Sequence, residues 1–314
     1  MKINILFDHE KMYYFWAFTM CYCLRKIGIE SDFFSLKKET DSQKVIYPDA
    51  DYYIILNHIY FGFKKNISEN VKYIGWITGP VDFSSQNPVI QNRTGYNREK
   101  TEWCEYILTT NLLEKEELEK KGIKVHGAFG FAYDEILNPY IYSGKYFRNI
   151  DALFCGSNTD RRRDVIYYLK NKINNFVHKE NYWNENYYEL LSHAKISLNI
   201  YEFDNNEVKN NFAIFRILSS MLQKCLVISE PMRNSSPFVN GKHLILCDVK
   251  DMPSMVQYYL NNPQKRQKIT NNAFDFLVNE YRMDNFLLEF IQAHIDSSAK
   301  IICSNPEIPV IQWL

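Results

Sequence analysis

The chain has 314 residues, and its 37 Lys and Arg residues are balanced by 37 Asp and Glu residues, so the formal net charge is zero. This length predicts one large domain or two of ordinary size, and the 46% share of hydrophobic residues excludes wholesale disorder. Zero net charge argues against a general nucleic-acid binder, because such binding depends on a basic surplus.

The first half of the sequence alternates strand-like and helix-like segments. Residues 2–7 are a short apolar strand, residues 11–27 have helical length and end at Gly28, and residues 29–36 are a second strand. A β-α-β opening implies a parallel sheet. The elements predicted next are strands at residues 51–56, 71–78 and 106–110, a helix at residues 112–121, and a last strand at residues 125–131.

A polar, Tyr-rich connector at residues 139–149 separates the two halves. We therefore predict a first domain at residues 1–145, a second at residues 146–283, and a C-terminal helix and tail at residues 284–314. The sequence predicts an α/β protein with two Rossmann-like domains, each a doubly wound parallel sheet. The elements predicted for the second half are strands at residues 152–155, 195–200, 225–229 and 243–247, and helices at residues 164–174, 187–193, 212–223, 252–261, 263–280 and 284–298.

The seven cysteines are scattered, odd in number, and include no C-x-x-C pair. This pattern indicates neither a zinc site nor a disulfide framework, so we expect free thiols in a reducing cytoplasm. The aromatic, apolar stretch at residues 12–24 is too short to span a bilayer, and we interpret it as a core helix. No histidine pattern has metal-ligand spacing, and we predict no metal.

Residues 153–163 run from a strand through Gly156 and Ser157 into three arginines at the expected start of a helix. Such a segment suits a diphosphate, since glycine allows close backbone approach, helix N-terminal amides point outward, and arginine offers a two-pronged donor. Gly156, Ser157, Arg161 and Arg162 are therefore candidate ligands. The alternative is a β-turn followed by a solvated basic helix end, and this segment alone does not separate the two.

Polar residues also follow the next two predicted strands. Asn199 and Tyr201 come at the end of one strand, where ligands bind in doubly wound sheets, although an ordinary β-α unit with a polar loop is an alternative. Arg216 stands inside an otherwise apolar helix and needs a partner or a ligand. Glu230 directly follows another strand, a position where carboxylates accept ribose hydroxyls. The alternative is an Arg216–Glu230 ion pair that only shapes the loop.

These segments carry a family resemblance. The chain is similar to glycosyltransferases of the GT-B fold, of the bacterial-type glycosyl transferases group 1 and its spore-maturation-protein-like branch. Many retaining members carry two glutamates around the arginine-bearing helix, whereas residues 211–219 contain none, so the stereochemistry stays open. The matching pieces, in the family's order, are F-x-G-S (residues 154–157), A-K-I-x-L-N-I (194–200), R-I-L-x-x-x-L-x-K-x-x-V-I-S-E (216–230), F-V-N-G-K-H-L-I (238–245) and Y-Y-L-N-N-P-x-K-R-x-x-I (258–269).

The resemblance implies a metal-independent hexosyltransferase-type enzyme of glycan biosynthesis that needs no cofactor. A nucleotide-diphosphate sugar would bind the second domain, with the arginines on the diphosphate, Glu230 on the ribose, and Asn199 and Tyr201 lining the cleft. The acceptor would be a hydroxyl of a glycan or another saccharide-containing molecule, and the tail at residues 284–314 would pack back on the first domain.

The resemblance also places the acceptor site on the first domain, near the loop after the first strand. His9 or Asp8 would act there as general base if the enzyme inverts, because an imidazole beside a carboxylate can titrate near neutrality. A loop histidine on the domain surface is the alternative. Thr78, Gly79 and Asp82, at the end of another strand, are candidates for contacts with acceptor hydroxyls.

Two other functions stay open. One is a catalytically inactive GT-B domain that acts as a binding or assembly partner, which the missing glutamates suggest. The other is a DNA-base glucosyltransferase, which would need a basic groove and is disfavoured by the zero net charge. We expect a nucleotide sugar and a hydroxyl acceptor as partners, no nucleic acid and no transmembrane segment, with peripheral membrane contact left open.

Overall fold

The computed structural model describes residues 1–8, 13–36, 48–56, 71–78, 81–142, 144, 147–182, 184–203, 214–309 and 312–313. The chain forms two compact units. Unit 1 comprises Met1–Ile136 and Arg282–Leu314, and unit 2 comprises Leu137–Tyr281. Each unit contains one sheet flanked by helices, and the paired strands that the structure describes are parallel, which confirms the predicted fold class.

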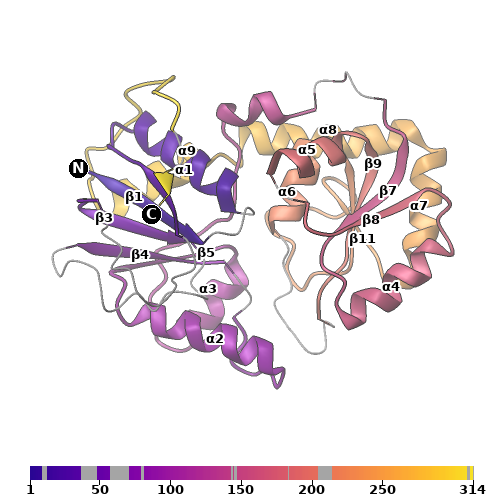
Figure 1. Ribbon diagram of the computed structural model, residues 1–314, viewed down its shortest axis with the longest axis horizontal. Coiled ribbons are helices and arrows are strands. Elements are labelled where there is room, and N and C mark those ends of the chain that lie inside the picture. Colours follow the sequence, from indigo (N-terminus) through magenta and orange to yellow (C-terminus); the bar gives the residue numbers. More distant parts are fainter. Residues whose placement is uncertain are drawn as a thin grey trace. The chain divides into compact units, whose positions relative to one another are not determined.

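The sheet of unit 1 has the strand order β12-β2-β1-β3-β4-β5-β6. Figure 1 shows α1 and α9 on one side of this sheet and α2 and α3 on the other. Most side chains of α1 are buried, because this helix contacts both the sheet and α9. The elements of unit 1 are β1 (Ile3–Asp8), α1 (Tyr14–Lys26), β2 (Phe33–Leu36), β3 (Tyr52–Leu56), β4 (Lys72–Ile77), α2 (Pro88–Thr101), β5 (Tyr106–Thr109), α3 (Leu112–Glu119), β6 (Gly127–Ala128), α9 (Met283–His294) and β12 (Gln312–Trp313).

The sheet of unit 2 has the order β11-β10-β9-β7-β8, with α4 and α7 on one side and α5 and α6 on the other (Figure 1). Apolar side chains of the strands, such as Phe154 and Ile196, pack with Ile166 of α4 and Val256 of α7. The elements are β7 (Ile150–Cys155), α4 (Asp160–Lys170), β8 (Phe176–Lys179), α5 (Asn184–Ser192), β9 (Ala194–Asn199), α6 (Ile214–Leu222), β10 (Leu226–Ser229), β11 (Ile245–Leu246), α7 (Met252–Asn261) and α8 (Pro263–Asn279), with short helices η3 (Glu135–Tyr140) at the entry and η4 (Val249–Asp251) before α7.

Several elements differ from the sequence prediction. Strand β8 and helix α2 were not predicted, because β8 is a partly exposed edge strand and α2 is polar and contains Gly95. Helix α4 begins at Asp160 instead of residue 164, since its charged first turn has no apolar signal. The predicted strand at residues 125–131 is only the two-residue β6, and β2 is shorter than predicted.

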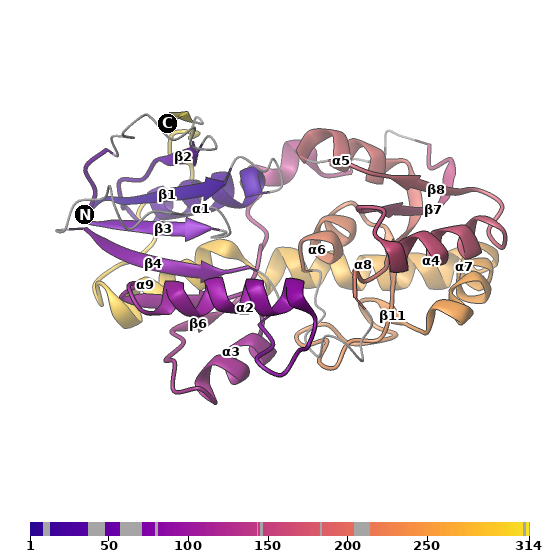
Figure 2. The same ribbon diagram turned by 60° about the horizontal axis from the view of Figure 1, so that its bottom comes forward.

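The chain enters unit 2 after Ile136 and returns to unit 1 at Arg282. The sequence prediction placed these junctions at 145/146 and 283/284. After the return, α9 packs against α1 within unit 1, and β12 pairs with β2, so β12 is the edge strand of the sheet; Figure 2 shows β2, β1, β3 and β4 in this order. In the described part of the chain, no helix combines the length and the apolar character that crossing a membrane requires.

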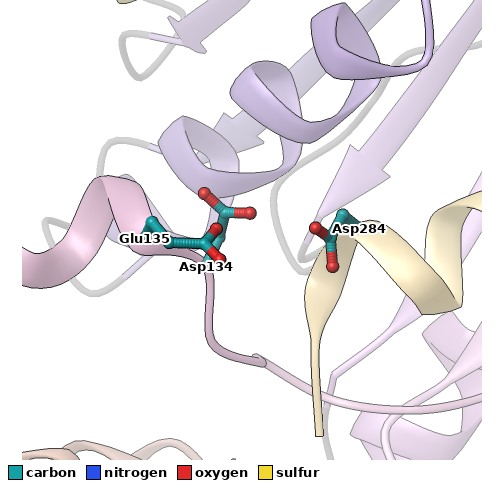
Figure 3. Close-up of side chains that lie close together, drawn as sticks. All are labelled: Asp134, Glu135 and Asp284. Atoms are coloured by element: carbon teal, nitrogen blue, oxygen red, sulfur yellow. The ribbon is translucent and has the colours of Figure 1, made fainter. Parts of the chain in front are cut away.

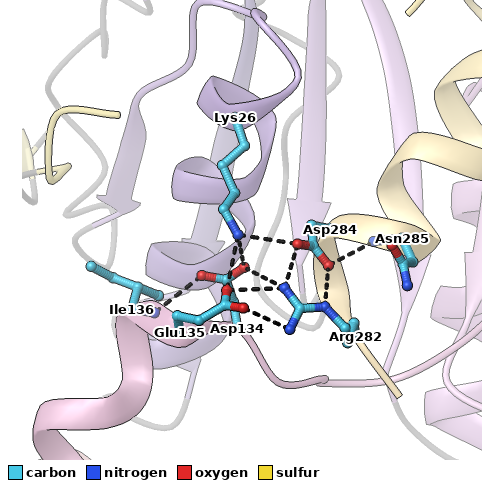
Figure 4. Close-up of polar contacts among 7 residues, drawn as sticks. All are labelled: Lys26, Asp134, Glu135, Ile136, Arg282, Asp284 and Asn285. Atoms are coloured by element: carbon cyan, nitrogen blue, oxygen red, sulfur yellow. Dashed lines mark hydrogen bonds and ion pairs between the residues drawn. The ribbon is translucent and has the colours of Figure 1, made fainter. Parts of the chain in front are cut away.

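An ionic cluster lies in unit 1 where the chain leaves for unit 2 and where it returns; Lys26, Asp134 and Asp284 are buried, whereas the Glu135 side chain is 50% exposed. Its acidic members are Asp134, Glu135 and Asp284, whose carboxylates point toward one another (Figure 3). The ammonium of Lys26, at the end of α1, donates one hydrogen bond to each carboxylate, over 2.6, 3.0 and 3.1 Å (Figure 4). Arg282 completes the cluster through Glu135 and Asp284.

Three carboxylate oxygens this close together can hold a metal ion. Here the Lys26 ammonium uses its three donors on the three carboxylates, and Arg282 supplies a second positive charge. Burial raises the pKa of Glu135, but hydrogen bonds from Arg282 and Lys26 outweigh it and lower this pKa to about 2. The acidic cluster is therefore compensated by protein cations, and it ties α1 to both chain junctions.

We predict that Lys26→Met lowers the free energy of unfolding by about 3–5 kcal/mol, because it leaves buried carboxylates without their shared cation. Chemical denaturation followed by circular dichroism measures this change. Lys72→Met is the matched control, since Lys72 pairs with Glu105 at the surface and its loss is expected to cost no more than about 1 kcal/mol. Equal, small losses in both variants would contradict the role given to Lys26.

A buried carboxyl, that of Glu114, lies at the start of α3. Glu114 is 2% exposed, and its Oε2 accepts hydrogen bonds from the backbone N–H (3.1 Å) and hydroxyl (2.7 Å) of Thr110. Asn111, the N-cap of α3, accepts from the Glu114 N–H through its Oδ1 (3.0 Å), so Glu114 is bonded to two consecutive residues before the helix. Burial outweighs these hydrogen bonds and raises the pKa of Glu114 to about 8.

Because the folded pKa of Glu114 lies above its usual value, its stabilising contribution is complete in acid and is lost as pH rises toward 8. We predict that between pH 5 and 8 the wild type loses about 1–3 kcal/mol of unfolding free energy relative to Glu114→Gln, which cannot ionise. Denaturation across this pH range tests it, with Glu119→Gln as an exposed control on the same helix. Parallel pH profiles for wild type and Glu114→Gln would contradict the assignment.

Candidate functional site

Polar residues of unit 2 gather at the carboxyl ends of β7, β9 and β10. These parallel strands lie side by side, with Ser229 of β10 opposite Asn199 of β9. Along the chain β7 is followed by β8, which lies on one side of it, and then by β9, which lies on its other side. The strand order therefore changes direction between β7 and β9. In open parallel sheets, ligands bind outside the carboxyl ends of the strands at such a reversal.

Arg216 bridges the two strands that border this reversal. Its Nε donates to the carbonyl of Cys155 at the end of β7 (2.9 Å), and its Nη1 donates to Oδ1 of Asn199 at the end of β9 (2.6 Å). Its guanidinium carbon lies 5.1 Å from the centre of the Phe154 ring. The side chain is only partly buried, and within the described chain Nη2 makes no hydrogen bond. One donor face of Arg216 therefore stays available to a ligand.

Gly156 is the residue against which Arg216 rests. A Cβ added there would lie 2.7 Å from Cζ of Phe154 and 3.1 Å from Nη2 of Arg216. These distances leave no room for a side chain without displacing the ring, and Arg216 lies at the limit of close contact. The glycine in the predicted turn is thus required by close packing against Phe154 and Arg216, whereas the approach of a ligand to its backbone stays a prediction.

Asn199 holds Arg216 in place from inside the protein. Its side chain is buried, and Nδ2 donates to Oγ of Ser229 (2.9 Å), whose hydroxyl donates to the carbonyl of Glu230 (2.8 Å). This chain fixes the orientation of the Asn199 amide, so Oδ1 faces Arg216. Asn199 therefore acts here as a support for Arg216, and Tyr201 is likewise buried.

Glu230 pairs with Arg161 and not with Arg216. Its Oε1 accepts from Nη2 of Arg161, and its Oε2 accepts from Nη1 of Arg161 (3.1 Å) and from the backbone N–H of Tyr201 (2.7 Å). The Glu230 side chain is 5% exposed and that of Arg161 25%. The Arg216–Glu230 ion pair considered from the sequence is wrong, because α4 brings Arg161 to the end of β10.

Arg162 is the most deeply buried cation of the group. Its Nε donates to the carbonyl of Ile200 (3.1 Å), its Nη1 to Oγ of Ser157 (3.0 Å), and its guanidinium lies 5.5 Å from the Phe154 ring centre. Burial lowers the pKa of Arg162, and the positive charge of Arg216 lowers it further. Burial also lowers the pKa of Arg216. A site that destabilises two neighbouring cations gains from an anionic ligand.

The N-terminus of α4 adds a second feature that favours an anion. Thr159 is its N-cap, yet the Thr159 hydroxyl is buried and, within the described residues, has no hydrogen-bond partner. Arg161 and Arg162 lie in the first turn of this helix, beside the amides that carry its partial positive charge. The sequence prediction missed Thr159, although a threonine directly before a charged helix start is an N-cap signal.

The candidates in unit 1 are only partly described. His9 and Gly79 lie outside the described residues, and Asp8 is the last residue of β1. The Thr78 hydroxyl lies 3.1 Å from the hydroxyl of Tyr13. Asp82 is buried, and its Oδ1 accepts from the N–H and the hydroxyl of Ser84. Thr78 and Asp82 both follow β4.

More than half of the chain, residues 116–292, matches a family model described as "Glycosyl transferase-like". The chain belongs to this glycosyl transferase-like family. The matched region contains all of unit 2, and with it every candidate ligand of the carboxyl-end site. No curated protein matches the sequence. The family match is broad, and the spore-maturation-protein-like branch stays a prediction.

Solved structures share the fold of this glycosyl transferase-like chain over nearly its whole length. Sucrose-phosphate synthase from Thermosynechococcus elongatus superimposes with a TM-score of 0.64 and 9% identity, over 94% of this chain and 98% of the other. Anabaena Alr3699/HepE in complex with UDP-glucose gives 0.62 and 10%, over 93% and 99%. An alpha-glucosyltransferase in complex with UDP-glucose and DNA containing an abasic site gives 0.61 and 12%, over 95% and 100%.

At these low identities the similarity establishes the fold, which is GT-B, with its two Rossmann-like domains. Not all similar structures have the same length. The alignment with TarM, at a TM-score of 0.55 and 10% identity, covers 76% of this chain and 54% of that one, so this chain spans about half of TarM.

The packing around Gly156 in this glycosyl transferase-like chain gives a direct test. Gly156→Ala is expected to lower the free energy of unfolding by about 1–3 kcal/mol, because the new methyl group overlaps Phe154 and crowds Arg216. Gly95→Ala in α2 is the matched control, since nothing lies within 4 Å of its added Cβ, and alanine is expected to stabilise that helix by about 0.5–1 kcal/mol. Thermal denaturation compares them, and a neutral Gly156→Ala would disprove the close packing.

Proposed function

We propose that the chain transfers a sugar from a nucleotide-diphosphate donor to a hydroxyl acceptor, and that the donor binds at the carboxyl ends of β7, β9 and β10. The observation that carries the proposal is Arg216. It is held by Cys155 and Asn199 at the strand-order reversal, and its Nη2 faces Gly156 without a hydrogen bond in the described chain. An arginine held in this way presents a fixed donor to a phosphate oxygen.

The charge of the site favours a diphosphate. Among the described residues, Arg161, Arg162 and Arg216 contribute three positive charges, against Glu230 and the neighbouring carboxylate of Glu202. A diphosphate at the N-terminus of α4 would offset this surplus and would accept from helix amides as well. The same donors would stabilise the diphosphate as it leaves, a role that divalent metals fill in other transferases. We therefore propose a reaction that needs neither metal nor cofactor.

The acceptor side of the proposal rests on family resemblance. A hydroxyl of a glycan or another saccharide-containing molecule would be the acceptor. If the reaction inverts the sugar, His9 or Asp8 would remove the acceptor proton as general base. Thr78, Gly79 and Asp82 would contact acceptor hydroxyls.

A panel of UDP-, GDP-, ADP- and dTDP-sugars tests the proposal. We expect at least one of them to stabilise the protein thermally and to be slowly hydrolysed, with the same result in EDTA. If no nucleotide sugar or nucleoside diphosphate binds, the enzyme proposal fails. The alternative of a catalytically inactive GT-B domain that acts as a binding partner would then remain. Salt-sensitive binding of duplex DNA, with glucose transfer to its bases, would instead support the DNA-base glucosyltransferase.

We predict that Arg216→Ala weakens binding of the nucleoside diphosphate product by about 1.5–3 kcal/mol, the scale of a charge-assisted hydrogen bond. Isothermal titration calorimetry measures the change. Arg163→Ala is the matched control, because Arg163 is exposed and pairs only locally with Asp160. Unchanged affinity in a folded Arg216→Ala protein would remove Arg216 from the site.

A further inference from the structure

Glu230 is the residue to which a donor ribose would bind, and its carboxylate already has three donors. Arg161 supplies two of them, through Nη1 and Nη2, and the Tyr201 N–H supplies the third. A carboxylate accepts about four hydrogen bonds, so it cannot take both hydroxyls of a ribose while these three stay in place. With its side chain only 5% exposed, Glu230 has little other surface to offer.

Arg161 is the partner that can leave. The Tyr201 N–H belongs to the backbone after β9, whereas Arg161 lies in the first turn of α4 and its side chain is 25% exposed. Arg162 is only 7% exposed, and in the described part of the chain neither Arg162 nor Arg216 donates to a carboxylate. Arg161 instead donates to the carboxylate of Glu230 and to the carbonyl of Tyr201. It does so at the N-terminal end of α4, where a phosphate is favoured.

We propose that Arg161 is an exchangeable counter-ion: it pairs with Glu230 in the free protein and moves to the diphosphate when the donor binds, which releases Glu230 for the ribose hydroxyls. This inference rests on the proposed function. The exchange leaves no buried charge unsatisfied, because two ribose hydroxyls replace the two donors of Arg161 and the Tyr201 N–H remains. The guanidinium in turn exchanges one anionic partner for another.

The exchange couples the binding of the nucleoside part of the donor to the binding of its diphosphate part. A nucleoside alone must compete with Arg161 for Glu230. Inorganic diphosphate alone draws Arg161 away and leaves the buried carboxylate short of donors. Each half therefore binds better when the other is present, and this coupling is reciprocal. The site would thus select intact nucleotide diphosphates over their fragments.

The test measures nucleoside binding by NMR titration, with and without saturating inorganic pyrophosphate. Uridine, adenosine and guanosine are the probes, with UDP, ADP and GDP as their parent ligands. In the wild type, pyrophosphate is expected to raise the affinity of the bound nucleoside by about tenfold. In Arg161→Gln the nucleoside is expected to bind without pyrophosphate about as tightly as it binds the wild type with pyrophosphate. Adding pyrophosphate to this variant is then expected to leave the nucleoside affinity unchanged. Arg163→Gln, the exposed neighbour on the same helix, is expected to behave like the wild type.

The outcomes separate the two proposals. If a nucleoside diphosphate binds the wild type but its fragments show no coupling, or if coupling persists in Arg161→Gln, the exchange is wrong and the donor site stands. If no nucleoside diphosphate binds, the proposed function itself fails. Glu230→Gln gives a second route should Arg161→Gln not fold. Released Arg161 is expected to increase pyrophosphate affinity at least fivefold in that variant, and an unchanged affinity would overturn the exchange.

Discussion

The parallel pairing of β9 with β7 on one side and β10 on the other is the constraint on which the site depends. Parallel strands end at the same edge, so Cys155, Asn199 and Glu230 meet there although they are far apart in the sequence. Arg216 can bridge β7 and β9 only because both ends lie at that edge. A slip of one residue in this register would turn the Asn199 side chain to the other face of the sheet and remove its hydrogen bond to Arg216.

The three arginines of the site differ in the groups to which they donate hydrogen bonds. Arg162 and Arg216 are anchored to strand-end carbonyls, and their rigidity favours the recognition of a fixed anion. Arg161 is held by a carboxylate that has a function of its own in the proposed reaction. The difference lies in the partners: Arg161 donates to the Glu230 carboxylate as well as to the Tyr201 carbonyl, and a carboxylate partner can be exchanged for the stronger anion of a diphosphate.

Unit 1 uses buried charge in another way. The Lys26 ammonium joins three carboxylates, two from the segment that leads into unit 2 and one from the start of α9. Such a cluster adds little net stability when complete but is costly to break, because each lost partner leaves a buried charge. It therefore specifies where the two chain segments meet. The family match, residues 116–292, contains both of these segments but not Lys26.

The alternation of strands and helices, a glycine turn at Gly156 and an arginine inside an apolar helix were all evident from the sequence, because periodicity, turns and isolated charges are local properties. The tertiary structure alone decided the partners of these residues. Arg161 reaches Glu230 across 69 positions, and Lys26 reaches Asp284 across 258. No local pattern records such pairs, because strand order and helix packing select them. The polar helix α2 and edge strand β8 were missed for the same reason: their stability comes from the sheet they cover or extend, and not from a pattern of their own.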